Sequence, residues 1–262
     1  MTEIQFEKYH GAGNDFILLD NRDEKIQLTQ PQISMLCDRH FGIGADGLIL
    51  IERSPSADFE MVYYNSDGRI ASFCGNGGRC AVIFASKIGL TGERIKFQAY
   101  DGMHEAIIIN ESTVKVSMNP VHGFEVDSNG DYLLNTGSPH LVQFVMSTSE
   151  TDVYMEGVRI RYSERFKDEG INVNFVSGRD DGIKMRTYER GVEDETLSCG
   201  TGTVAAAIVI SVERNKTGLQ YYTIQAPGGE LKVYFNRTSE KEFQDVWLEG
   251  PVSFVFAGTM KI

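Results

Sequence analysis

Two short motifs that begin with cysteine carry the clearest chemical signal in the sequence. Cys74-Gly-Asn-Gly77 and Cys199-Gly-Thr-Gly202 each follow a segment with strand character and open an apolar segment that is typical of a helix. At the start of a helix, unpaired backbone N–H groups and the positive end of the helix dipole stabilise an anion, and the pKa of a thiol can fall there from about 8.5 to about 7 or below. The motifs therefore predict two reactive thiols, one at each helix start.

The same backbone groups are suited to holding a substrate carboxylate, because the glycines of both motifs have no side chain to block its approach. A small anion flanked by two thiols could lose a proton from its carbon to one sulfur and receive a proton on the opposite face from the other. That exchange inverts the carbon centre. The alternative interpretation is that both cysteines are only small residues at crowded turns.

The distance between the motifs indicates a repeat. They lie 125 residues apart in a chain of 262 residues, which is close to half its length. The economical interpretation is two similar α+β halves related by pseudo-symmetry, with a boundary near Asn119-Pro120 and the two Cys-Gly turns facing each other across the interface. We therefore expect an N-terminal half at residues 1–119 and a C-terminal half at residues 120–252.

Alternating apolar positions predict many short strands, and helices are the minority. We expect helices at residues 31–39, 77–88 and 202–214. The last two are apolar on nearly all sides, which suits helices enclosed by other structure, and we expect each to lie inside a curved sheet. The alternating positions are Ile4/Phe6, Phe59/Met61/Tyr63, Val114/Val116/Met118, Ile183/Met185 and Leu231/Val233/Phe235.

A third glycine-rich segment, Gly42-Ile-Gly-Ala-Asp-Gly47, matches the dinucleotide-binding pattern G-x-G-x-x-G. That motif requires a strand before it and a helix after it, whereas here a predicted helix precedes it and the strand-like segment 48–51 follows. We therefore expect a turn whose glycines adopt positive φ, and no nucleotide site.

The four cysteines show no spacing typical of a metal site, since there is no C-x-x-C motif and the five histidines are scattered. Cys37 and Cys80 lie in apolar helical patterns, where a buried and inert thiol is the usual state. We therefore predict that no metal is bound. Four cysteines are also too few for a disulfide scaffold, and a reducing compartment would keep them as thiols.

Composition and charge exclude several functional classes. The chain is 41% hydrophobic and 24% charged, which is an ordinary globular mixture. Its net charge of −12 repels phosphate backbones, so nucleic acid is not an expected partner. The apolar run 204–210 is far shorter than the roughly 20 residues that span a bilayer, and residues 1–10 lack the apolar block of a signal peptide. We expect a cytoplasmic protein without membrane contact.

Several polar residues stand at predicted strand ends or in loops rich in glycine: Asn14-Asp15, Asn65, Asn172 and Glu189-Arg190. Most residues of this kind form turns or are solvated. For Glu189 and Arg190, a buried ion pair or a bidentate contact with a carboxylate stays open.

With these residues in view, the sequence resembles the diaminopimelate epimerase family. The matching segments occur in order and span nearly the whole chain, and together they are highly specific. They are His10-Gly-Ala-Gly-Asn-Asp-Phe16, Asn65-Ser-Asp-Gly68, Cys74-Gly-Asn-Gly-Gly-Arg-Cys80, Gly137-Ser-Pro-His140, Asn172-Val-Asn-Phe175, and Tyr188-Glu-Arg-Gly191 leading to Cys199-Gly-Thr-Gly202.

The resemblance implies an enzyme without pyridoxal phosphate or another cofactor that interconverts LL- and meso-diaminopimelate, on the lysine and peptidoglycan pathway of bacteria or plants. It implies two pseudo-symmetric halves, each a curved, mostly antiparallel sheet around a central helix. The last strand, at about residues 253–262, would return to the first half.

The resemblance also implies site roles. Cys74 and Cys199 would be the two proton-transfer residues, acting as thiolate base and thiol acid. The carboxylate of the reacting centre would be held by backbone groups at Gly75, Asn76, Gly200 and Thr201. Asn65 and Glu189 would lie near its ammonium group, and His140 near the thiols. The unreactive end of the substrate would be fixed by Asn14, Asn172 and Arg190.

Two positions depart from the family pattern. Ser138 stands where many members have asparagine before Pro-His, and Gly47 stands where some have glutamine. Both concern contacts with the distal end of the substrate.

Two other interpretations stay open. A racemase of the same fold that acts on a one-ended amino acid would keep both cysteines, with less need of Arg190 and Asn172. A non-catalytic redox or thiol-binding module would use the cysteine pair without chemistry at a carbon centre. The sequence names no partner beyond a small-molecule substrate and leaves a homodimer open.

Overall fold

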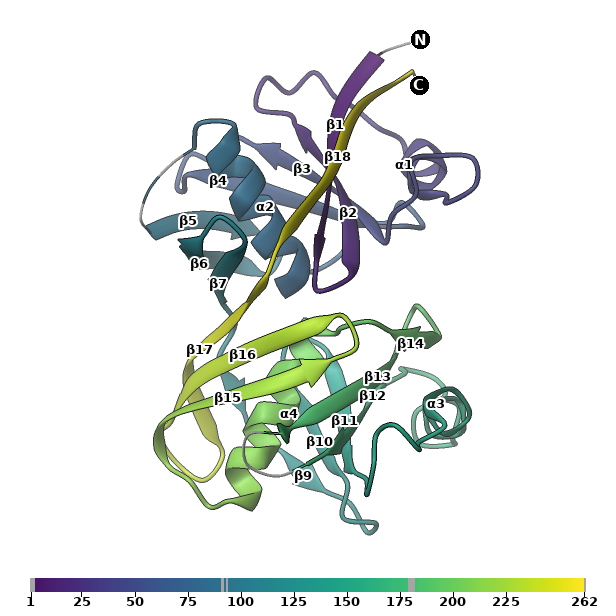
Figure 1. The fold of residues 1–262 in the computed structure, drawn as a ribbon, viewed down its shortest axis with the longest axis vertical. Coiled ribbons are helices and arrows are strands. Elements are labelled where there is room, and N and C mark those ends of the chain that lie inside the picture. The colour runs from purple at the N-terminus through teal and green to yellow at the C-terminus, as the bar shows by residue number, and fades with distance from the viewer. Residues whose placement is uncertain (1–2, 91, 93, 179–181, 262) are drawn as a thin grey trace. The chain divides into compact units, whose positions relative to one another are not determined.

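The chain forms two compact units, each described here by itself. The computed structural model describes residues 3–90, 92, 94–178 and 182–261, so the ends of the expected halves at residues 1–2 and 262 lie outside the described residues. Unit 1 consists of residues 1–116 and 250–262, and unit 2 of residues 117–249. Both units are α+β, with many strands and few helices (Figure 1).

Unit 1 is a mostly antiparallel sheet. Only the pairs β2–β3 and β4–β5 are parallel among its described strand pairs. The C-terminal strand β18 pairs antiparallel with β1, and Figure 1 shows the two running side by side. The elements are β1 (Glu3–Gly11), β2 (Asn14–Asp20), α1 (Gln30–Cys37), β3 (Gly47–Glu52), β4 (Phe59–Asn65), α2 (Gly75–Lys87), β5 (Arg94–Ala99), β6 (Gly102–Asn110), β7 (Thr113–Ser117) and β18 (Ser253–Lys261).

Unit 2 repeats this plan. Its described strand pairs are antiparallel except β11–β12 and β13–β15. The elements are β8 (Val121–His122), β9 (Glu125–Val126), β10 (Tyr132–Asn135), β11 (Pro139–Phe144), α3 (Val153–Arg161), β12 (Asn172–Ser177), β13 (Lys184–Glu189), β14 (Asp194–Thr196), α4 (Gly200–Glu213), β15 (Gly218–Ala226), β16 (Gly229–Arg237) and β17 (Glu242–Pro251).

The order of elements is the same in both units. Two strands, a helix, two strands, a second helix and two further strands follow one another from β1 to β6 and again from β10 to β16, with β14 as an addition in unit 2. The parallel pairs also fall at the same places in this order. The pseudo-symmetric α+β fold expected from the sequence is therefore confirmed.

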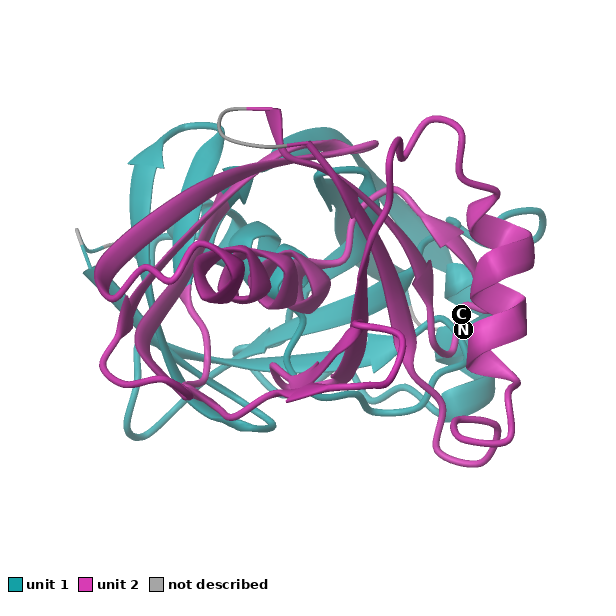
Figure 2. Ribbon diagram, turned by 90° about the horizontal axis from the view of Figure 1, so that it is seen from below, with its two compact units in different colours: residues 1–116, 250–262 teal, residues 117–249 magenta. Residues whose placement is uncertain are grey.

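The second helix of each unit is enclosed by its own sheet. Helix α2 contacts β1, β2, β3, β4 and β6, and α4 contacts β10, β11, β12, β13, β15 and β16. Figure 2 shows α4 inside the curved sheet of unit 2. Nearly every residue of α4 from Thr203 to Ser211 is fully buried, as an all-round apolar helix requires. The expectation of enclosed helices is confirmed.

Both enclosed helices begin two residues earlier than predicted. They start at Gly75 and Gly200, directly after the cysteines, where residues 77 and 202 were expected. Glycine has a low helix propensity, which hid these turns. In the first turn of a helix the backbone N–H groups have no intrahelical partner, so a glycine there costs less than one in the middle.

Helix α3 was missed by the sequence analysis. It runs over the core cluster Leu141, Val153, Ile160, Ile171, Val173, Phe175 and Tyr188. Asp152 begins the helix by accepting a hydrogen bond from the N–H of Met155 at 3.0 Å. Gly157 in its middle weakens the helical pattern, yet a Cβ there would lie 2.3 Å from Cγ of Tyr188. Close packing against Tyr188 therefore explains why position 157 is glycine, the residue that weakened the helical pattern in the sequence.

The glycine-rich segment 42–47 follows α1 and leads into β3, which begins at Gly47, so the predicted order of a helix before it and a strand after it is confirmed. The predicted reason for its glycines is partly wrong, because only Gly44 has a positive φ, of 80°. A Cβ at Gly42 would lie 2.0 Å from the carbonyl oxygen of Met35, and one at Gly47 2.5 Å from that of Tyr64. Close approach of backbone accounts for these two.

Candidate functional site

Cys74 and Cys199 have the same backbone setting. Each is the residue that precedes its helix, with φ −112° and ψ 117° at Cys74 and φ −119° and ψ 113° at Cys199. The Cys74 carbonyl accepts the N–H of Gly78 at 2.7 Å, and the Cys199 carbonyl that of Thr203 at 2.9 Å. Each thiol therefore stands at the positive end of a buried helix, as the spacing of the motifs predicted.

In unit 1, two asparagines lie beside Cys74. The Cys74 thiol donates to Oδ1 of Asn14 at 3.6 Å, and Nδ2 of Asn76 donates to the same oxygen at 3.3 Å. Nδ2 of Asn14 in turn donates to Asp46 at 2.7 Å, which fixes the orientation of the amide. Asn14 was expected at the unreactive end of a substrate, and the structure places it in contact with the Cys74 thiol.

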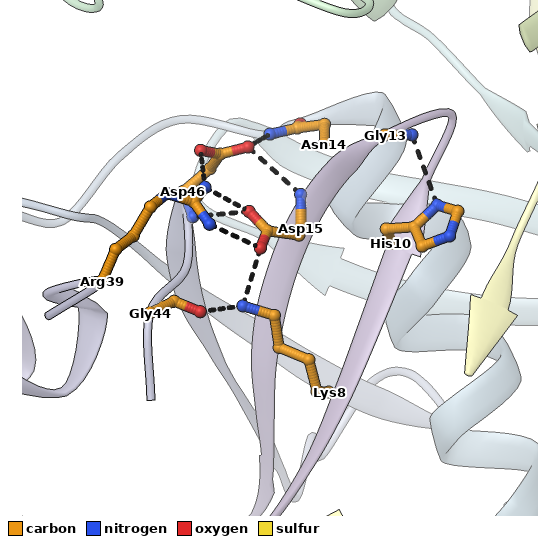
Figure 3. A network of polar contacts seen from close by, with 8 residues as sticks. All are labelled: Lys8, His10, Gly13, Asn14, Asp15, Arg39, Gly44 and Asp46. Atoms are coloured by element: carbon orange, nitrogen blue, oxygen red, sulfur yellow. Dashed lines mark hydrogen bonds and ion pairs between the residues drawn. The ribbon is translucent and has the colours of Figure 1, made fainter. Parts of the chain in front are cut away.

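A four-residue charge cluster supports Asn14 (Figure 3). Asp15 forms ion pairs with Lys8 and Arg39, each at 2.8 Å, and Arg39 also reaches Asp46 at 2.8 Å. Although burial acts to raise it, hydrogen bonds from Arg39 and Lys8 hold the pKa of Asp15 well below its usual range. Two cations and two anions thus form a neutral scaffold, of which the sequence analysis had named only Asp15.

Asn65 lies at the end of β4, where it was expected near the substrate ammonium. Its Oδ1 accepts a hydrogen bond from the Tyr63 hydroxyl at 3.0 Å. The Tyr63 ring occupies the space beside Gly47, because a Cβ there would lie 2.6 Å from Cε2 of that ring. The glycine at position 47, where some family members have glutamine, therefore leaves room for the Tyr63 ring. The sequence analysis did not single out Tyr63 for the site.

In unit 2, a hydrogen-bonded chain leads from the core to Cys199. Nδ2 of Asn174 lies 3.1 Å from Nδ1 of His140, and Nε2 of His140 lies 2.9 Å from Oγ1 of Thr201. Because Asn174 donates to Nδ1, the ring proton belongs on Nε2, which donates to Thr201. Oγ1 of Thr201 lies 3.5 Å from the Cys199 sulfur.

Burial, and secondarily the charge of Arg190, lowers the pKa of His140 to about 3, so the ring is neutral near pH 7. His140 was expected near the thiols, and Thr201 connects it to Cys199. Asn174 was missed, although it lies two residues after Asn172 in one strand and so faces the same side of the sheet.

Three residues that were expected at the unreactive end of the substrate, or next to it, lie together in unit 2. Nδ2 of Asn172 donates to Oγ of Ser138 at 2.9 Å, and Oδ1 of Asn172 accepts the N–H of Arg190 at 2.9 Å. The Arg190 guanidinium donates to the carbonyl of Glu169 at 3.0 Å and to Oγ of Ser138 at 3.4 Å. Ser138 thus joins the asparagine to the arginine, and Arg190 itself is exposed.

Glu189 ends β13 directly before Arg190, and one of its carboxylate oxygens accepts the Thr196 hydroxyl at 2.8 Å. This places Glu189 at the end of β13 as Asn65 is placed at the end of β4, the two strands that correspond in the repeat.

Internal packing explains two glycines of the cysteine motifs. A Cβ at Gly202 would lie 2.3 Å from Oδ1 of Asn174, and a Cβ at Gly77 3.1 Å from Cδ1 of Ile49. Close packing is therefore one reason for glycine at these positions, and the predicted approach of a substrate carboxylate stays a prediction.

Cys37 and Cys80 are buried, as predicted. Burial raises the pKa of Cys37 to about 12 and that of Cys80 further, so both stay protonated near neutral pH. Among the described residues, no three His, Cys, Asp or Glu side chains are grouped as metal ligands would be. Within the same part of the chain, no helix has the length and apolar character needed to cross a membrane.

Comparison with known proteins gives one family. The family model for diaminopimelate epimerase matches residues 6–123 and 132–255. The diaminopimelate epimerase of Flavobacterium psychrophilum is 48% identical over 97% of this chain and 98% of its own length. That of Chlorobaculum tepidum is 43% identical over 96% and 99%.

Solved structures at low identity share the fold. A phenazine biosynthesis protein of Bacillus anthracis superposes with a TM-score of 0.77 at 16% identity, covering 100% of both chains. A hydroxyproline epimerase of Agrobacterium vitis superposes with a TM-score of 0.71 at 12% identity, covering 98% of this chain and 92% of that one. With the family model matching almost the whole chain and both cysteine motifs in place, this chain belongs to the diaminopimelate epimerase family.

Proposed function

We propose that the protein interconverts LL- and meso-diaminopimelate, with Cys74 and Cys199 exchanging protons on opposite faces of one carbon. The observation that carries the proposal is the matched setting of the two cysteines at the starts of two buried helices. Membership of the family and the names of its relatives support the substrate. Such an activity serves lysine and peptidoglycan precursor synthesis.

The chemistry requires stabilisation of a carbanion. Removal of a proton from the α-carbon of an amino acid leaves negative charge that spreads into the adjacent carboxylate. Helix N-termini supply fixed N–H groups and a positive dipole end, which stabilise that charge without reorganisation during the reaction. We assign this task to the backbone at Gly75, Asn76, Gly200 and Thr201.

The proton balance requires one thiolate and one thiol. The thiolate takes the α-proton and becomes a thiol, while the other thiol gives its proton to the opposite face and becomes a thiolate. Two like charges near one anionic substrate resist double ionisation, which favours the singly ionised pair. The reverse reaction uses the two residues in exchanged roles.

The remaining assignments concern binding. Asn65 and Glu189 would contact the ammonium group of the reacting centre, since both end corresponding strands. Asn172, Ser138 and Arg190 already form one hydrogen-bonded group, which suits a second carboxylate. Asn14 would serve the same distal end while bordering Cys74, and His140 would orient Thr201 beside Cys199.

The test is a proton spectrum of LL-diaminopimelate in D₂O with the purified protein. We expect loss of the α-proton signal and appearance of the meso isomer. Exchange with a one-ended amino acid but not with diaminopimelate would favour a racemase of the same fold. Absence of exchange with both would overturn the epimerase proposal and favour a redox or thiol-binding module.

A further inference from the structure

Arg79 is a buried cation behind the helix start at Cys74. Its side chain has no exposed surface and is the largest among the fully buried side chains. Its guanidinium donates to Oδ1 of Asn76 at 2.7 Å and to the carbonyl of Gly75 at 3.3 Å. Its Nε is buried and has no hydrogen-bond partner among the described residues. The guanidinium therefore lies against the first turn of α2 with part of its donor capacity unused.

The sequence makes room for this arrangement at Gly11 on β1. A Cβ at Gly11 would lie 2.8 Å from the carbonyl oxygen of Asn76 and 3.3 Å from an amino nitrogen of Arg79. Any larger residue would push the first turn of α2, or the guanidinium, away from the strand.

Arg79 carries its charge at neutral pH. Burial lowers its pKa to about 10, and the charges of Cys80 and Cys74 act in the opposite direction. In the part of the chain that the structure describes, no carboxylate contributes to this balance. The Cys80 thiol stays protonated because burial raises its pKa. The thiol of Cys74 is thus the group left to supply a compensating negative charge.

In unit 2, the described residue at the position that corresponds to Arg79 is not a cation. The position 125 residues after Arg79 is Val204, which is fully buried. His140 is neutral near pH 7. Glu189 and Arg190 carry opposite charges side by side, and Arg190 is exposed, so water screens it. The two helix starts share a backbone but differ at this position, where unit 1 has a buried arginine and unit 2 a buried valine.

Other groups in unit 1 do not replace Arg79. The cluster around Asn14 contains two cations and two anions, so its net charge is zero (Figure 3). Oδ1 of Asn14 accepts the Cys74 proton at 3.6 Å and therefore favours the protonated thiol, but it is one weak and neutral contact. The other titratable groups on the strands that pack against α2 include Glu7, Tyr9 and His10 on β1, Tyr63 and Tyr64 on β4, and His104 on β6.

We propose that Arg79 is a positioning residue that stabilises the thiolate of Cys74, so that in the unliganded protein Cys74 carries the negative charge and Cys199 keeps its proton. The Cys74 proton passes to water, and no electrons are exchanged. This deepens the proposed function, on which its catalytic meaning rests, because it names the sulfur that is ready to act as base.

The test is titration of each thiol in the full-length protein without substrate. Ultraviolet absorbance of the thiolate is followed against pH in Cys199→Ala, which reports Cys74, and in Cys74→Ala, which reports Cys199. We expect the lower midpoint for Cys74. In the Cys199→Ala background, Arg79→Gln should raise that midpoint by about one unit or more, which lowers the thiolate fraction at acidic pH about tenfold.

Two controls separate charge from packing. Arg79→Lys keeps a cation and should keep most of the lowered midpoint. Arg237→Gln removes a buried arginine of unit 2, whose side chain donates to the carbonyls of Ser211, Lys216 and Glu240, and should leave the Cys74 midpoint unchanged. A lower midpoint at Cys199, or no shift with Arg79→Gln, would overturn the proposal.

The result does not depend on turnover. If Arg79→Gln does not fold, the titration midpoints of Cys74 and Cys199 can still be compared in proteins that keep Arg79. Equal midpoints would contradict the proposal. A lowered Cys74 midpoint in a protein that exchanges no α-proton would overturn the epimerase function and leave the role of Arg79 in place.

Discussion

The surroundings of Cys74 and Cys199 differ more than their backbones do. The two N-terminal positions agree within 10° in φ and ψ. Behind Cys74 lie a buried arginine and two asparagines, whereas behind Cys199 lie a threonine and a neutral histidine. The two halves of the repeat share the backbone of the helix start and differ in the side chains around each thiol.

This difference shows how a repeated fold can perform a reaction that is not symmetric. Inversion of one carbon needs a base on one face and an acid on the other, so two identical thiol environments would give no preference for either role. Different polar neighbours on the same backbone supply a preference without changing the anion-binding geometry.

The largest expected effect comes from loss of either sulfur. Cys74→Ser and Cys199→Ser should each lower turnover of diaminopimelate by about 10²–10⁴-fold, because a hydroxyl is a much weaker base near neutral pH. Turnover is measured by the appearance of the other isomer from LL- and from meso-diaminopimelate. Cys37→Ser is the control, since that buried thiol has no assigned role. Near-wild-type epimerisation by either single variant contradicts the two-base assignment.

The next largest effect is expected from Arg190 of unit 2, which we assign to the distal carboxylate of diaminopimelate. Arg190→Met should lower kcat/KM for diaminopimelate by about 10- to 150-fold, since a hydrogen bond to a charged group contributes about 1.5–3 kcal/mol. Lysine lacks the distal carboxylate, so we expect it to be a poor substrate of the native protein. Its kcat/KM should change much less in Arg190→Met than that of diaminopimelate.

The control for Arg190 is Arg159→Met, which removes an exposed arginine of unit 2 that pairs with Glu156. An unchanged ratio of the two substrates in Arg190→Met would mean that Arg190 only holds Ser138 and the carbonyl of Glu169. A racemase of a one-ended amino acid would then gain support.

Local patterns in the sequence were sufficient for the enclosed helices and for several strands. Alternation at Leu231, Val233 and Phe235 predicted β16, and the apolar run after Cys199 predicted α4, because burial on one or all sides leaves a periodic signal. Helix α3 has no such clear signal. The repeat itself could have located it, since α3 occupies the place of α1 in the second half.

The supporting residues of the site could not be predicted in the same way. Asp46 acts through a contact with Asn14, and contacts of this kind depend on which strands become neighbours. Sequence separation gives no indication of them: Asp46 is 32 residues from Asn14. The reason for Gly157 was equally hidden, because it depends on a ring 31 residues further along the chain.

A smaller effect tests the two outer helices against each other. Gly157→Ala in α3 should lower the free energy of unfolding by about 1–3 kcal/mol, because the new Cβ would overlap the Tyr188 ring. Ser34→Ala at the corresponding position of α1 is the matched control and should change it by less than about 0.5 kcal/mol. Urea denaturation of both variants gives the comparison, and equal stabilities would show that the Tyr188 ring can move aside.

The smallest effect is a pH dependence that belongs to His140 alone. Its folded-state pKa, about 3, lies below the value of about 6.5 for an unfolded chain. Between these values the unfolded chain binds a proton that the folded protein does not, so stability falls as the pH falls below about 7. From pH 7.5 to pH 6 this one group should remove about 0.8 kcal/mol. His140→Gln should lose that part of the slope, while His40→Gln, an exposed histidine of unit 1, should keep it. Ordinary carboxylates titrate below pH 6, so they contribute little to the change in stability between pH 7.5 and pH 6. If the slope is unchanged in His140→Gln, His140 takes up a proton in the folded protein. The hydrogen-bonded chain from Asn174 through a neutral His140 to Thr201 would then be wrong.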